Sequence, residues 1–178
     1  MSKSKHLLVI VVPLLFVISF LTSCAGLQAE PSSTTTLDCP LPTTGTLLLK
    51  DEEAGYCLLY PEGHGVVIPF AGEVCLVPGE PPYPLKCAEN ILTINVEGMD
   101  GRTGEQVADA VAVDMNCSDE RYNLAIANEE AVVLSECKGQ DLTRKVLIIH
   151  ADRLYTLTFS DLSERFYAQV ITSFTFLR

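Results

Sequence analysis

Residues 153–176 read RLYTLTFSDLSERFYAQVITSFTF, and within this stretch a strand pattern gives way to a helix pattern. The first half alternates large apolar side chains with threonines, which is the two-residue period of a half-buried strand. The second half predicts an amphipathic helix that begins at Asp161, whose side chain caps the helix while Glu164 reaches back. The apolar residues of the strand are Tyr155, Leu157 and Phe159, and those of the helix are Phe166, Val170, Ile171 and Phe174.

Strand-like segments also precede this stretch, at 46–50, 55–61, 65–70, 73–77, 90–98, 131–137 and 144–151. The first two flank a turn-like stretch and resemble a hairpin, and 65–70 with 73–77 could form a second pair. One segment, 103–115, has helical spacing instead, and Thr103 followed by Gln106 forms a capping box at its start. The order is therefore strands, helix, strands, helix. This order favours an α+β domain, with an antiparallel sheet of about six strands and helices packed on it.

The N-terminus has the anatomy of an export signal. Lys3 and Lys5 are followed by an apolar run from Leu7 to Leu21, and then by small residues. A helix that spans a bilayer needs about twenty apolar residues, so this run is too short for a permanent span. We therefore expect residues 1–23 to be a cleaved signal peptide.

The sequence Leu21-Thr22-Ser23-Cys24 resembles the bacterial lipoprotein box, in which the cysteine receives a diacylglyceryl group and becomes the mature N-terminus. The resemblance implies an exported lipoprotein that is anchored through Cys24 on the extracytoplasmic side of the cell membrane. The alternative is an ordinary signal peptide in which this cysteine has no role.

The rest of the chain divides into two parts. Residues 24–46 are rich in serine, threonine and proline, as expected of a tether, and residues 47–178 have the size of a single α+β domain. Loss of Lys3 and Lys5 with the signal leaves 10 basic and 23 acidic residues, so the net charge changes from −11 to −13. This acidity argues against nucleic-acid binding, because phosphates would be repelled.

Six cysteines remain after Cys24, an even number, and in an exported chain this predicts three disulfides. Six cysteines allow 15 pairings. Cys75–Cys87 is favoured because the segment between these two residues holds four prolines, and Cys39–Cys57 with Cys117–Cys137 is one way to pair the others. A metal site is the rival interpretation, but no Cys-x-x-Cys and no Cys/His pair at zinc spacing occurs. We expect no metal and no cofactor.

GYCLLYPEG (55–63) and the closing stretch quoted above resemble the PsbP/Mog1-like superfamily over residues 54–178. Members share an early Gly-aromatic strand that runs into Tyr-Pro, and a closing strand, helix and Ser-Phe. The resemblance implies an α/β/α sandwich with an antiparallel sheet. It also implies a non-enzymatic role, since members include extrinsic photosystem subunits, assembly factors, a small-GTPase regulator and exported lipoproteins. No site residue is carried over from the family.

The sequence contains few candidates for catalysis. His64 in EGHG is most simply part of an exposed turn, and no Gly-x-Ser-x-Gly elbow provides a nucleophile. His150 and Asp152 would share a face if their strand continued, and such a pair could orient a general base.

Two functions therefore remain. The preferred one is a non-enzymatic binding or accessory module that contacts a partner protein or membrane complex through a sheet edge or an exposed loop. The Pro-rich loop with Tyr83 is a candidate contact, or it only closes the sheet edge. The alternative is an extracytoplasmic small-ligand binder or hydrolase that uses His150 and Asp152.

Overall fold

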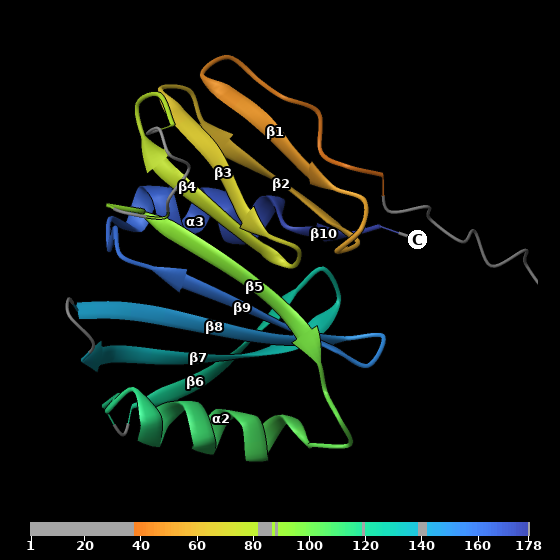
Figure 1. Cartoon of the computed structure of the whole chain (residues 1–178), viewed down its shortest axis with the longest axis vertical. Coiled ribbons are helices and arrows are strands. Elements are labelled where there is room, and N and C mark those ends of the chain that lie inside the picture. The colour runs from red at the N-terminus through yellow and green to blue at the C-terminus, as the bar shows by residue number, and fades with distance from the viewer. Residues whose placement is uncertain (1–37, 82–86, 88, 119, 139–141, 178) are drawn as a thin grey trace, which may run out of the picture. The chain divides into compact units, whose positions relative to one another are not determined.

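The structure is a computed structural model that describes residues 38–81, 87, 89–118, 120–138 and 142–177. Within these residues it contains ten strands and two helices (Figure 1). In chain order they are β1 (Thr46–Asp51), β2 (Tyr56–Pro61), β3 (His64–Phe70), β4 (Glu73–Pro78), β5 (Leu92–Gly98), α2 (Gly104–Asp114), β6 (Arg121–Ile126), β7 (Glu129–Lys138), β8 (Leu142–His150), β9 (Arg153–Phe159), α3 (Glu164–Ser173) and β10 (Thr175–Phe176).

The strands form two antiparallel sheets. A seven-stranded sheet has the order β3-β4-β5-β9-β8-β7-β6, and a three-stranded sheet has the order β1-β2-β10. The predicted α+β class is confirmed, although the ten described strands exceed the expected number. Two of the additional strands are β6, which the sequence pattern did not indicate, and β10, which pairs with β2.

The large sheet buries both of its faces. Residues that alternate along β7, β8 and β9 pack on opposite sides, as the two-residue period requires. One side, here called the α2 face, clusters with α2 through Leu134, Leu147 and Leu154. The other side, the α3 face, clusters with α3 and β2 through Val133, Ile148 and Leu157, and Figure 1 shows α2 and α3 at separate places along the sheet.

The two helices begin differently. At α2 the predicted capping box is confirmed, because the Thr103 hydroxyl accepts the Gln106 N–H at 3.3 Å and the Gln106 side chain accepts the Thr103 N–H at 2.9 Å. At α3 the predicted cap is wrong. The N-cap is Ser163, Asp161 accepts the Ser163 N–H at 2.8 Å in a turn before the helix, and Glu164 pairs with Arg144 instead of reaching back.

The apolar stripe predicted for α3 is confirmed. Phe166, Val170 and Phe174 are buried in the core of the α3 face, and Ile171 packs against them. Phe166 meets Phe159 of β9 edge to face, with ring centroids 6.0 Å apart. Burial of one such side chain contributes about 1.5–3 kcal/mol to folding. The closing strand and helix therefore supply a large part of the core that holds the two sheets together.

Candidate functional site

The structure separates His150 from Asp152. Strand β8 ends at His150, and Ala151 and Asp152 form a hairpin turn in which both residues have positive φ. The ring of His150 contacts Glu129, with Nδ1 and Oε1 2.7 Å apart, and stacks on Phe176 at a centroid distance of 4.0 Å. His150 and Asp152 were expected to share a face only if their strand continued, and β8 ends at His150.

Asp152 instead lines a cavity of about 470 Å³ at the turn end of the sheet, to which His150 does not contribute. The guanidinium of Arg153 beside it donates to the backbone carbonyls of Glu53 and Ala54, at 3.0 and 3.3 Å. The described residues of this cavity include no histidine, cysteine or serine. The arrangement does not place a general base beside a nucleophile.

His64 is also not in an exposed turn. It is the half-buried first residue of β3, and its Nδ1 lies 3.1 Å from the carbonyl oxygen of Pro61. Its ring stacks near Phe166 of α3, with the centroids 6.3 Å apart. These contacts give His64 a packing role at the join between the two sheets.

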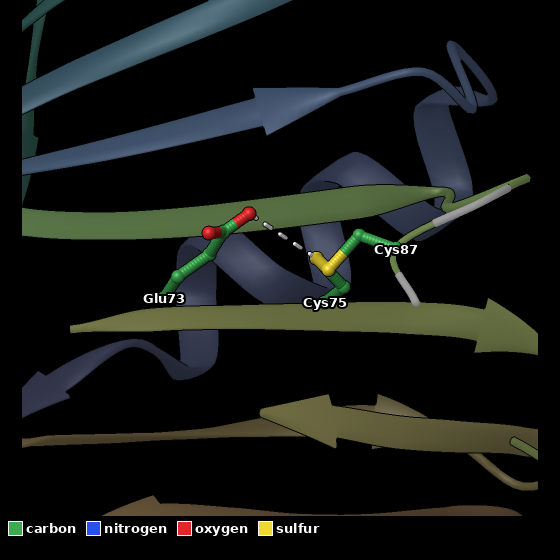
Figure 2. Close-up of side chains that lie close together, drawn as sticks. All are labelled: Glu73, Cys75 and Cys87. Carbon is green, nitrogen blue, oxygen red and sulfur yellow. Dashed lines mark hydrogen bonds between the residues drawn. A yellow bond between two sulfur atoms is a disulfide. The ribbon is translucent and has the colours of Figure 1, made fainter. Parts of the chain in front are cut away.

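The structure contains the disulfides Cys39–Cys57, Cys75–Cys87 and Cys117–Cys137, the same pairs that the sequence suggested. Figure 2 shows Glu73 beside the second of these, with Oε1 4.0 Å from Cys75 Sγ. The carboxylate and the two sulfurs lie within 4.8 Å of one another, which is close enough to surround a metal ion. However, cysteine binds metals as the thiolate, and both sulfurs are held in a disulfide. With the disulfide formed, Glu73, Cys75 and Cys87 do not supply the thiolates that a metal site would need.

The Pro-rich segment after β4 first continues the pairing of β4 with β3 and then packs against β3. The Gly79 N–H donates to the carbonyl of Gly63 at 2.8 Å, and a methyl group placed on Gly65 would come within 2.5 Å of the Pro81 ring. The described start of the loop therefore extends the β3–β4 hairpin and packs against the first half of β3. Tyr83 and the other residues at 82–86 lie outside the described residues.

The second half of β3 is not covered in this way. β3 is the terminal strand of the large sheet, and its side chains of Ile68 and Phe70 are 57% and 72% exposed. Val67 between the covered and exposed halves is fully buried. We call Ile68 and Phe70 the β3 rim. Two large apolar side chains exposed on one edge strand are a candidate contact surface.

A groove of about 390 Å³ lies between the start of α2 and the α2 face of strands β6 to β9. Its floor is apolar and is made by Val132, Leu147, Ile149 and Leu154. The first helical residue of α2, Gly104, packs so closely on the sheet that a Cβ there would lie 2.9 Å from Ile149 Cδ1. This volume is within the range of small-molecule pockets.

The rim of the groove is polar and is formed by Glu105, Arg121, Asn123 and Glu130. Arg121 of β6 pairs with Asp109 of α2 at 2.6 Å, and Asn123 donates to Glu130 at 2.6 Å. The sequence did not point to this groove, because its walls come from a helix and four strands that meet only in the folded chain.

One buried cation lies on the same sheet face without lining the groove. Lys145 of β8 is 8% exposed, and its ammonium group donates to Thr158 Oγ1 at 2.9 Å. Burial lowers the pKa of Lys145 below its usual value of 10.5 because the charged form loses solvation. Among the described residues, Lys145 is the one charged residue that is buried. Its hydrogen bond to Thr158 links β8 to β9.

No protein-family model matches this chain, and no curated protein sequence matches it. Among solved structures, the solution structure of cyanobacterial PsbP (CyanoP) from Synechocystis sp. PCC 6803 is similar, with a TM-score of 0.54. The fold is PsbP-like. The match covers 78% of this chain and 97% of the cyanobacterial chain at 15% sequence identity, so the similarity concerns the fold alone.

None of the described helices is long and apolar enough to cross a membrane. Cys24 and the predicted signal peptide lie outside the described residues.

Proposed function

We propose that this chain is an exported lipoprotein, anchored through Cys24 on the extracytoplasmic side of the cell membrane, that serves as a non-enzymatic accessory module for a partner protein. The lipoprotein-like Leu21-Thr22-Ser23-Cys24 and the preceding apolar run support the anchor. The PsbP-like fold supports the accessory role. The non-enzymatic role is also supported by the contact of His150 with Glu129 rather than with Asp152, the residue with which the hydrolase alternative paired it.

The β3 rim is the observation that carries the docking proposal. A Phe side chain that is 72% exposed beside a 57% exposed Ile leaves apolar area in water that a partner would bury. Burial of apolar area contributes roughly 25 cal/mol per Å² before the costs of association. We propose that the partner has an apolar pocket in which the Phe70 side chain is buried.

The contact uses side chains rather than an added strand. An edge strand ordinarily offers its backbone N–H and C=O groups to a further strand. In β3, however, Pro69 lacks an N–H, and the register with β4 shifts between Val67 and Phe70. Both features weaken strand addition at the rim, while the side chains of Ile68 and Phe70 remain available.

The test is chemical crosslinking in native membranes, followed by affinity purification of the tagged full-length protein. We expect Phe70→Ser to lower the recovery of the crosslinked partner at least about fivefold, the loss expected when one aromatic anchor of an interface is removed. Val113→Ser is the matched control, because Val113 is a 79% exposed apolar residue on α2, away from β3.

Equal recovery with Phe70→Ser and the native chain would overturn docking at the β3 rim. Recovery of the native protein alone would overturn the accessory role itself. The anchor has its own test, the mass of the mature N-terminal peptide, which should include acyl chains on Cys24. Replacement of Cys24 by Ala should release the protein from membranes, and retention of that variant would contradict the anchor.

A further inference from the structure

The groove between α2 and the large sheet has the construction of a site for a small molecule. Its floor is apolar and is formed by side chains from three neighbouring strands, among them Val132 and Leu147. The close packing of Gly104 on Ile149 fixes the distance between helix and sheet on one side, and the Arg121–Asp109 pair connects them on the other. A pocket that is already formed binds without a large ordering cost.

The charged side chains at the edge of the groove determine which kind of ligand it would bind. The guanidinium of Arg121 is already paired with Asp109 at 2.6 Å. Glu105 has no hydrogen-bond or ion-pair partner among the described residues, and Glu130 is bonded only to the neutral amide of Asn123 there. The groove therefore presents two carboxylates that have no cationic partner, and one guanidinium, that of Arg121, which is already paired with Asp109. The net charge of the chain is −11.

The N-terminus of α2 does not change the preference of the groove for a cation over an anion. The first turn of a helix attracts anions through its free N–H groups. Here the Thr103 hydroxyl already accepts the Gln106 N–H, and the carboxylate of Glu105 supplies negative charge in that turn. Lys145 lies on the same face, but it is 8% exposed and does not line the groove.

We propose that this groove binds a small organic cation with an apolar body, of the class of aralkyl or alkyl primary amines. The apolar body lies on Val132, Leu147 and Leu154, and the ammonium group lies between Glu105 and Glu130. This site is independent of the β3 rim, which belongs to the opposite edge strand of the sheet.

The test compares three probes of the same shape: phenylbutylamine, phenylbutanol and phenylbutyrate. Each is titrated into the purified chain with its disulfides intact, and binding is followed by the methyl NMR signals of Val132 and Leu147 together with calorimetry. We expect the amine to bind about tenfold more tightly than the alcohol, since charge-assisted hydrogen bonds are stronger than neutral ones. The acid should bind least, and added salt should reduce the preference for the amine.

Two variants separate charge from shape. Glu105→Gln with Glu130→Gln should bring the affinity for the amine down to that for the alcohol, while Glu62→Gln with Glu80→Gln, at two exposed carboxylates outside the groove, should leave the preference unchanged. Val132→Phe should fill the floor and weaken all three probes, and its circular dichroism spectrum reports whether the fold is intact.

Stronger binding of phenylbutyrate than of the amine would overturn the assignment of a cation. Absence of any change at Val132 and Leu147 with all three probes would overturn the groove as a small-molecule site. If the double Gln variant instead loses the protein partner while the probes do not bind, the groove belongs to the protein contact and the inference fails. A failure of Phe70→Ser to affect partner recovery would concern only the accessory proposal.

Discussion

The hydroxyl groups of Tyr56 and Tyr155 lie in the same core and differ in their hydrogen bonds. The two rings meet edge to face with centroids 6.1 Å apart. Tyr155 Oη donates to the carbonyl of Ala54 at 2.9 Å, whereas the buried Tyr56 Oη has no partner among the described residues. Burial raises the pKa of both side chains, so both remain protonated.

This difference predicts opposite effects for the same substitution. Tyr155→Phe removes a buried hydrogen bond and should lower the free energy of unfolding by about 1 kcal/mol. Tyr56→Phe removes an unpaired buried hydroxyl and should raise it by about 1 kcal/mol. Equilibrium urea unfolding of the oxidised protein measures both. Equal destabilisation by the two variants would contradict the prediction and show that Tyr56 Oη has a partner.

At the residue scale the sequence was informative wherever periodicity decides burial. The alternation of Tyr155, Leu157 and Phe159 placed all three in the core, and all three are buried there. The sequence pattern was misleading where a short polar side chain could hydrogen-bond to more than one backbone N–H group. Asp161 bonds to Ser163 in a turn rather than capping α3, and the spacing of Asp161 and Glu164 does not distinguish these outcomes.

The two helices provide a controlled comparison of capping. Thr103 makes a side-chain cap at α2, whereas Ser163 makes none at α3. Thr103→Ala should therefore lower the free energy of unfolding by about 1 kcal/mol. Ser163→Ala should change it by less than about 0.5 kcal/mol. Urea unfolding again provides the measurement, and an equal loss at both positions would mean that the capping box does not stabilise α2.

At the scale of elements, the sequence indicated those strands whose apolar residues form a run or a clear alternation. It failed for β6 because Arg121, Tyr122 and Asn123 all remain exposed at the sheet edge, so that the segment has no apolar side until its end. It also failed for β10, which has two residues. That strand exists because Phe176 is buried and its backbone meets β2, a long-range pairing that local sequence does not encode.

At the scale of the whole molecule, the predicted pairs 46–50 with 55–61 and 65–70 with 73–77 are confirmed as β1–β2 and β3–β4. The division of the strands into two sheets was not predictable. β2 and β3 are joined by a tight turn at Glu62 and Gly63, the usual sign of a hairpin. Yet β2 pairs with β1 and β10, and β3 pairs with β4. The groove was not predictable either, because it forms only when α2 packs across the four consecutive strands β6 to β9.

The disulfide Cys39–Cys57 determines where the proposed tether ends. It attaches the chain to buried β2 before β1 begins at Thr46. From Cys24 to Cys39 the tether has roughly fifteen residues, so it reaches at most about 50 Å from the membrane. A cut between Cys39 and Thr46, near the 85% exposed Leu41, would therefore leave the domain attached through the disulfide.

This arrangement predicts how the protein leaves the membrane. In a variant with a specific protease site within 40–45, we expect cleavage to release the domain only after a reductant is added, because the disulfide still joins the two pieces. A matched variant with the same site between Cys24 and Cys39 should release the domain at once, with or without reductant. Sedimentation of membranes followed by electrophoresis of both fractions measures the release. Release of the first variant without reductant would contradict the Cys39–Cys57 bond, and retention of both variants under all conditions would contradict an anchor at Cys24.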